Sequence, residues 1–124
     1  MQGKKILIID DDFHINQLVQ ATFAEQGAEV VTAVNGQEGL RQFSTHKPDL
    51  VIIDLMLPEM DGWEVTERIL ETADVPIIML TSLRDDTDVI RGLEQGKIDF
   101  VTKPFSPKVL AARARAALRH GTAS

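Results

Sequence analysis

Short apolar runs alternate along this chain with longer segments in which apolar side chains recur at helical spacing. Runs of roughly four to eight apolar residues are typical of buried strands, and a spacing of three or four residues is typical of one face of a helix. The predicted strands cover residues 5–10, 29–33, 50–53, 77–80 and 100–102, and the second is expected to be the most exposed. Repeated alternation of strand and helix predicts an α/β fold, in which helices cover a parallel sheet.

Turn and capping residues set the ends of the predicted helices. Gly27 and Gly96 suit the ends of the first and fourth helices. Ser106 as N-cap and Pro107 as first residue begin the last helix, over roughly 107–120. The positions that define the five helices are Ile15, Leu18, Val19, Thr22 and Phe23; Leu40 and Phe43; Trp63, Val65, Ile69 and Leu70; Val89, Ile90 and Leu93; and, facing inward, Val109, Leu110, Ala114, Ala117 and Leu118.

The composition narrows the classes of protein that fit. A length of 124 residues suits one domain, which we expect over 1–120, with 121–124 as a tail or the start of a linker. The net charge of −6 argues against direct binding of nucleic acid or a membrane surface. The absence of cysteine excludes disulfides and thiolate metal sites. The apolar stretch after residues 1–5 is too short for a signal peptide or a membrane span, so we expect a cytoplasmic protein.

Polar residues follow four of the predicted strands. Asp10 and Asp11 end the first, Asp54 the third, Thr81 the fourth and Lys103 the fifth. The carboxyl ends of strands in an open parallel sheet form one crevice, so carboxylates, a hydroxyl and an ammonium group are expected to converge there. Such a set suits a hard divalent cation and a phosphoryl group.

The three acids at 10–12 have a plainer explanation as the start of a helix, because acids complement the helix dipole there. Three in a row are more than a cap requires. Bringing Asp10 and Asp11 close to Asp54 would raise their pKa values by mutual repulsion unless a cation neutralised them. A weak, water-rich Mg²⁺ site is the hypothesis that resolves this repulsion.

Asp54 and Lys103 also have plainer explanations, as a turn residue and as a surface lysine. The next helix begins some eight residues after Asp54, so capping does not explain it. A carboxylate at this place can act as a nucleophile toward phosphorus. The bond from Lys103 to Pro104 is a candidate for a cis peptide that would direct the lysine to the crevice.

Four segments of the chain carry a recognisable pattern: ILIIDDD at 6–12, PDLVIIDLMLPEMDG at 48–62, PIIMLTS at 76–82 and DFVTKPFSP at 99–107. Together they resemble the receiver domain of two-component response regulators, and the second and fourth segments most resemble the OmpR/PhoB branch. The resemblance covers about residues 3–120. It implies a flavodoxin-like, five-stranded parallel sheet with strand order 2-1-3-4-5, and a switch protein rather than a turnover enzyme.

The resemblance also implies a phosphoryl site. Asp54 would accept the phosphoryl group of a sensor histidine kinase in a reaction that the chain itself catalyses with Mg²⁺, as it does the dephosphorylation. The metal ligands would be Asp10, Asp11, Asp54 and the backbone carbonyl of Met56. Thr81 and Lys103 would contact phosphoryl oxygens, and Phe100, which lacks the hydroxyl of the usual tyrosine, would be the aromatic switch residue.

The surface implied for dimerisation on phosphorylation is formed by the fourth helix, fifth strand and last helix. Its charged residues are partly kept, as Arg91, Asp99 and Arg113. Ile98 and Val109 stand where the branch often has acids. We therefore expect a weaker homodimer, in which Ile98 and Val109 partly compensate through apolar contact.

Two other classes of function fit parts of the pattern. An aspartyl-phosphate phosphatase needs a second acid two residues after its nucleophile, and Met56 holds that position here. A docking module that works without phosphorylation would normally lack Asp54, Lys103 or the acid pair, all of which are present. Measured phosphate incorporation separates the three classes.

Overall fold

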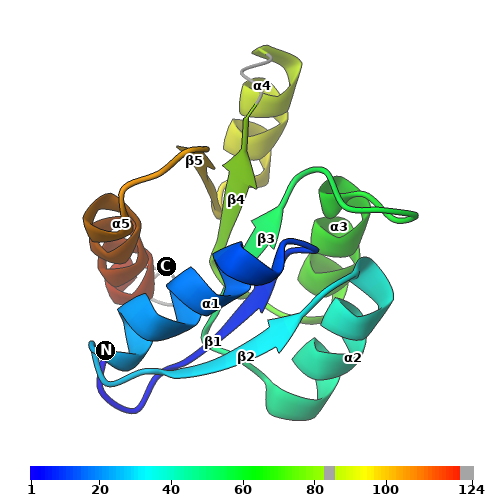
Figure 1. Cartoon of the computed structure of the whole chain (residues 1–124). Helices are drawn as coiled ribbons and strands as arrows, with labels where there is room; N and C mark the ends of the chain where they lie inside the picture. Colours follow the sequence, from blue (N-terminus) through cyan, green and yellow to red (C-terminus); the bar gives the residue numbers. More distant parts are fainter. Residues whose placement is uncertain (83–85, 121–124) are drawn as a thin grey trace.

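Five strand–helix units follow one another in the computed structural model, which describes residues 1–82 and 86–120 (Figure 1). All five predicted strands and all five predicted helices are present, with ends within a few residues of the expected ones. The expectation for 121–124 falls outside the described residues. The elements are β1 Lys5–Ile9, α1 Phe13–Ala24, β2 Glu29–Ala33, α2 Gly36–His46, β3 Leu50–Asp54, α3 Gly62–Thr72, β4 Ile77–Thr81, α4 Asp86–Gln95, β5 Ile98–Thr102 and α5 Pro107–His120.

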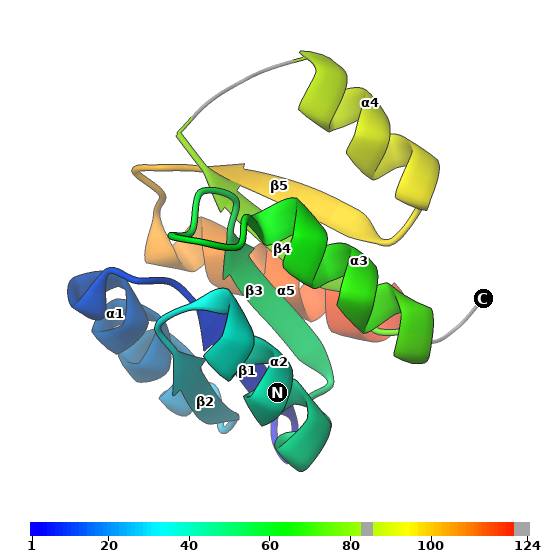
Figure 2. The same ribbon diagram turned by 90° about the vertical axis from the view of Figure 1, so that its right-hand side faces the viewer.

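The strands form one parallel sheet in the order β2-β1-β3-β4-β5, as predicted. Helices α1 and α5 cover one face of the sheet, and α2 and α3 cover the other (Figures 1 and 2). The register pairs Ile9 with Ile53, and Asp54 with Leu80. The carboxyl ends of β1, β3 and β4 therefore lie side by side, which is what brings the polar residues after them together.

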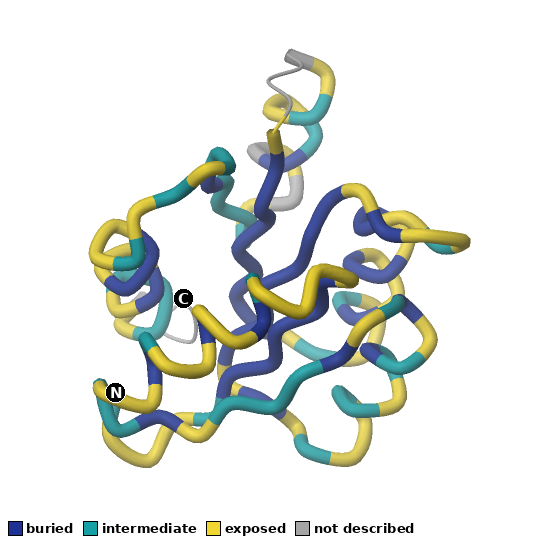
Figure 3. The backbone as a smooth tube through the Cα atoms, viewed as in Figure 1, coloured by how far each residue is buried: buried dark blue, intermediate teal, exposed yellow. Residues whose placement is uncertain are grey.

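Apolar side chains of the central strands are buried on both faces of the sheet. Ile6 and Ile8 pack toward α1 and α5, whereas Leu7 and Ile9 pack toward α2 and α3. Strands covered on both sides read as continuous apolar runs, which explains why β1, β3 and β4 were recognisable from sequence. Strand β2 lies at the edge and is only partly buried, as predicted (Figure 3).

Two predicted inward positions are wrong. Leu18 is 39% exposed and Val109 is 49% exposed. The buried residues of α1 are Asn16, Val19 and Phe23. The buried face of this helix therefore includes a polar residue that the apolar spacing did not predict. The two apolar residues Val89 and Ile90 of α4 are also exposed. No helix in the described ranges is both long enough and apolar enough to cross a membrane.

Candidate functional site

Three carboxylates meet at the carboxyl end of the sheet. Asp10 follows β1, Asp11 comes next, and Asp54 is the last residue of the neighbouring strand β3. One carboxylate oxygen from each lies within 4.8 Å of the other two, a grouping that could hold a metal ion. Asp10 and Asp54 are buried, whereas Asp11 is exposed. The structure thus brings together the acids that the sequence predicted would converge.

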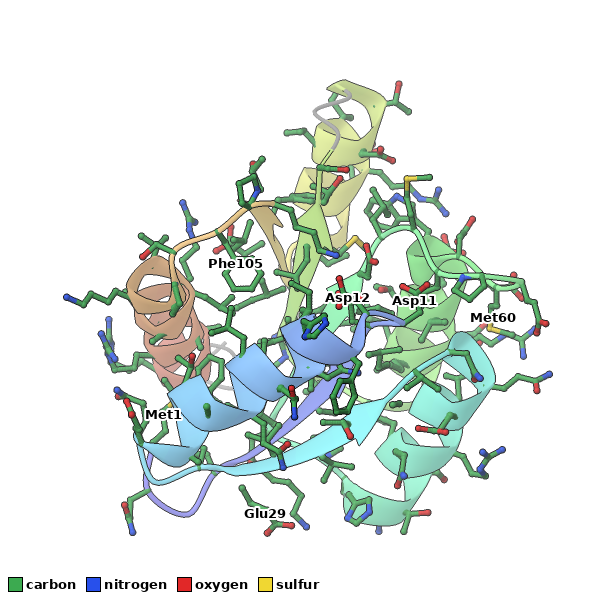
Figure 4. The ribbon with its side chains drawn as sticks, in the orientation of Figure 1. Met1, Asp11, Asp12, Glu29, Met60 and Phe105 are labelled. Carbon is green, nitrogen blue, oxygen red and sulfur yellow. The ribbon has the colours of Figure 1, made fainter. Side chains whose placement is uncertain are left out.

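The turn between β1 and α1 gives its three acids different tasks. Asp12 is the N-cap of α1, and its carboxylate accepts a hydrogen bond of 2.8 Å from the backbone N–H of His14. The Asp12 N–H donates to Oδ1 of Asp10 at 2.9 Å. Capping therefore explains Asp12 and not its two neighbours. Figure 4 shows Asp11 and Asp12 in this turn.

Asn16 holds the same turn from inside α1. Its side-chain amide donates to the backbone carbonyl of Asp10 at 2.9 Å, and the residue is 5% exposed. Sequence reasoning missed this residue, because apolar spacing alone defined the inward face of the helix. The only signal was a polar residue between two positions of the predicted buried stripe.

Lys103 joins the cluster from the end of β5. Its ammonium nitrogen Nζ lies 3.0 Å from Oδ2 of Asp10 and 3.3 Å from Oδ2 of Asp54. The backbone N–H of Lys103 donates to the carbonyl of Thr81 at 2.8 Å. The Lys103–Pro104 peptide bond is cis, as predicted. The lysine is consequently an ion-paired member of the site and not an ordinary surface residue.

Burial and charge shift the protonation of Asp10 and Lys103. Burial raises the pKa of Asp10, and the charge of Asp54 adds to this, although the Asp12 N–H and Lys103 partly offset both effects. Burial lowers the pKa of Lys103, but its hydrogen bond to Asp10 and the two carboxylate charges outweigh burial, so that pKa is raised overall. One ammonium group among three carboxylates leaves net negative charge, and a hard cation coordinated by the oxygens would offset it.

Thr81 and Phe100 lie on the neighbouring strands β4 and β5. Thr81, the last residue of β4, is buried and is paired in register with Thr102 of β5. Phe100 packs with the side of the core formed by α3, where its ring meets Trp63 edge-on with centroids 6.1 Å apart. The two residues predicted as the switch pair thus lie on adjacent strands, with Thr81 at the end of β4 and Phe100 beneath α4.

Met56 lies beside the acids through its backbone. Its N–H donates to Oδ1 of Asp54 at 3.1 Å, and its side chain is 62% exposed. A cavity of about 560 Å³ opens here, large enough for a small anionic group. Its lining residues are Asp11, Leu55, Met56, Leu57, Pro58, Asp61, Trp63 and Asp88.

The residues expected at a dimer surface make contacts within the chain. Arg113 of α5 forms an ion pair of 2.9 Å with Asp99 of β5. Arg91 of α4 pairs with Glu67 of α3, and no local sequence pattern predicts this contact between residues far apart in the chain. Val109 is exposed on α5.

Comparison with known families and curated proteins gives concordant matches. The family model described as "Response regulator receiver domain" matches residues 6–115. A probable transcriptional regulator ycf27 of Porphyridium aerugineum is 46% identical over 119 residues, which is 96% of this chain and 50% of that protein. The transcriptional regulatory protein AfsQ1 of Streptomyces coelicolor is 46% identical over 94% of this chain and 52% of its own length. The chain therefore spans about half the length of such relatives.

Solved structures give the same fold. A two-component response regulator from Clostridium difficile superposes with a TM-score of 0.89 at 29% identity, covering 96% of this chain and 98% of that chain. The BeF3-activated N-terminal receiver domain of RstA from Klebsiella pneumoniae has a TM-score of 0.85 at 35% identity, covering 94% and 99%. The predicted strand order and fold class are confirmed.

Proposed function

This chain belongs to the response regulator receiver domain family, and on that premise we propose that it accepts a phosphoryl group from a sensor histidine kinase on Asp54. The observation that carries the assignment is the place of Asp54. It ends a buried strand, lies within metal-ligand reach of Asp10 and Asp11, and has the ammonium group of Lys103 at 3.3 Å. Among the acids that line the cavity beside Met56, Asp61 caps α3 and Asp88 accepts a hydrogen bond from Trp63.

The proposed transfer is a displacement at phosphorus. A carboxylate oxygen of Asp54 forms the new P–O bond while the P–N bond of the phosphohistidine breaks and its electron pair returns to the imidazole. Lys103, whose ammonium nitrogen lies 3.3 Å from Asp54, would exchange this contact for a phosphoryl oxygen, and its charge would stabilise the transition state. The hydroxyl of Thr81 is proposed to contact a second phosphoryl oxygen.

We propose Mg²⁺ as the metal, held by Asp10, Asp11, Asp54 and the backbone carbonyl of Met56. The donor set supports this, because all four groups offer hard oxygen atoms. The bound ion supplies positive charge to the phosphoryl oxygens. Few protein ligands and an exposed Asp11 favour weak binding, with water completing the coordination.

Mass spectrometry with a small phosphodonor tests the acceptor. We expect one phosphoryl adduct on the unsubstituted chain and none on Asp54→Asn. Asp12→Asn is the matched control, because asparagine also caps a helix and the neighbouring acids stay in place. Undiminished labelling of Asp54→Asn would refute the assignment, and labelling at full rate in EDTA would refute the need for a metal.

We propose a switch and not a turnover phosphatase. The residue two positions after Asp54 is Met56, which offers no general acid to a leaving group. The intact ion-paired cluster of Asp10, Asp54 and Lys103 argues against a docking module that works without phosphorylation. If the chain released phosphate from small esters as fast as a true phosphatase does, the assignment as a switch would be contradicted.

The proposed output is a changed surface on α4, β5 and α5 that promotes a homodimer. Phosphorylation would draw Thr81 toward the phosphate and let Phe100 turn inward, a shift between two populations of one fold. The names of the relatives suggest that the signal regulates transcription. With a net charge of −6, these residues are not proposed to bind nucleic acid themselves, and a cytoplasmic location is expected. Light scattering with and without beryllofluoride tests the dimer.

A further inference from the structure

From its place in the first turn of α3, Trp63 contacts two other elements, α4 and β5. Its indole N–H donates to Oδ1 of Asp88 on α4 at 2.8 Å. The guanidinium group of Arg91, also on α4, lies 4.5 Å from the centre of the ring. The ring meets that of Phe100 on β5 edge-on, at 6.1 Å between centroids. One buried side chain thus links α3, α4 and β5.

The contacts between α3 and α4 form a set that we call the Trp63 cluster, consisting of Trp63, Glu67, Asp88 and Arg91. Glu67 accepts from Arg91 and so holds the guanidinium group over the indole ring. Trp63 and Glu67 are four residues apart on α3, and Asp88 and Arg91 are three apart on α4, so each pair lies on one helix face. Figure 2 shows α4 beside α3 and above β5.

Phe100 lies directly under the backbone of α4. A Cβ atom added to Gly92 would come within 2.3 Å of Cε2 and 2.7 Å of Cζ of the Phe100 ring. The ring therefore fills the space that a side chain on Gly92 would need. Any rotation of Phe100 removes the edge-on partner of Trp63 and the support beneath Gly92 together.

We propose that Trp63 is a positioning residue that transmits the rotamer of Phe100 to α4. The ring of Trp63 contacts Phe100 on one side and holds α4 through Asp88 and Arg91 on the other, so a displaced indole shifts the helix that it holds. The Trp63 cluster also keeps Arg91 on its own chain, away from a second copy. This inference rests on the proposed function only in taking Phe100 as the switch residue.

The first test needs no phosphoryl group. Hydrogen exchange of α4 amides is measured in the metal-free chain of residues 1–124, where Asp88→Ala removes the acceptor of the indole N–H. We expect α4 to exchange about threefold to tenfold faster, as for loss of one hydrogen bond of ordinary net strength. Arg68→Ala is the matched control, because it breaks an exposed ion pair with Glu64 within α3. Equal exchange in the two variants would overturn the proposal.

The second test measures the coupling. As a single substitution, Phe100→Leu should speed hydrogen exchange in α4. In a chain that already carries Trp63→Phe, which keeps an aromatic ring without the N–H, it should add little. The chain has one tryptophan, so one indole N–H resonance reports the bond to Asp88, and Phe100→Leu should move it. Additive effects of the two substitutions and an unmoved resonance would overturn the coupling.

Beryllofluoride then separates this inference from the proposed function. If the unsubstituted chain binds it and α4 exchange changes, the change should be lost in Asp88→Ala and kept in Arg68→Ala. A change that persists in Asp88→Ala would overturn the inference while leaving phosphorylation intact. Failure to bind beryllofluoride would remove the proposed function, and the two ligand-free tests would still decide the role of Trp63.

Discussion

The charged form of Asp10 destabilises the folded chain, although metal binding requires it. Burial and the charge of Asp54 raise its pKa, so the folded chain binds a proton there more tightly than the unfolded chain does. The contribution of such an acid to the free energy of unfolding is largest below its ordinary pKa of 3.8, and it falls as the pH rises through the raised pKa of the folded state. At neutral pH the charged Asp10 therefore lowers the free energy of unfolding.

Asp10→Asn tests this balance at neutral pH. In EDTA we expect the variant to be more stable than the unsubstituted chain, on the order of 1 kcal/mol, since the buried charge is removed. With Mg²⁺ the order should reverse, because only the unsubstituted chain gains binding energy in the folded state. Urea unfolding followed by circular dichroism measures both differences. A variant that is less stable in EDTA would contradict the prediction.

Asp11 differs from Asp10 in being exposed, so its removal should affect the metal and not the fold. Trp63 lines the same cavity, which makes its fluorescence a reporter of binding there. Asp11→Ala should lose the quenching of Trp63 by Mg²⁺ and change the free energy of unfolding by less than about 0.5 kcal/mol. Asp12→Asn should keep the quenching. If quenching survives in Asp11→Ala, this residue is not a ligand.

At the scale of elements, Gly92 and Phe100 determine how closely α4 approaches β5. Gly92→Ala adds a Cβ atom that would lie 2.3 Å from the Phe100 ring, so the ring or the helix must move. The strain, about 1–3 kcal/mol, should exceed the gain in helix propensity of about 1 kcal/mol. We expect lower stability and faster exchange in α4, whereas Glu94→Ala on the exposed side should change neither. If Gly92→Ala left the stability and the hydrogen exchange of α4 unchanged, the Phe100 ring would be able to move aside without a cost in free energy.

The sequence predicted the strands better than the faces of the helices. Strands β1, β3 and β4 are buried on both sides, so their residue types alone identify them. A helix face depends on what packs against it, and Leu18 and Val109 are exposed although their spacing fits the buried stripe. Spacing within a helix carries no information about such neighbours.

The candidate site was predictable to the extent that strand ends define it. Asp10 and Lys103 each follow a strand and Asp54 ends one, and the sheet order then places them together. The bond from Trp63 to Asp88 joins two helices across 25 residues, and no local pattern marks either partner. The contact of Asn16 with Asp10 was missed for a different reason, since a polar residue on a buried face contradicts the usual helix pattern.

At the scale of the whole molecule, the surface of α4, β5 and α5 offers apolar side chains where charge was expected. Arg91 and Asp99 are paired within the chain, with Glu67 and Arg113. The exposed residues Val89, Ile90 and Val109 are left to contact a second copy. Salt screens exposed ion pairs strongly but weakens apolar burial little.

The proposed dimer should therefore be weak and nearly independent of salt. Sedimentation equilibrium of the beryllofluoride-treated chain at low and high ionic strength measures this, and a dimer held by charged pairs would dissociate as salt rises. Val109→Asp should weaken association at least about tenfold, because a charge would enter the apolar contact. Leu18→Asp is the matched control, an exposed apolar residue on α1 that lies outside this surface. Steep salt dependence with no effect of Val109→Asp would show instead that Arg91 leaves the Trp63 cluster to pair between chains. That result would make opening of the cluster a step in dimerisation, and it would be visible as a shift of the indole N–H resonance with protein concentration.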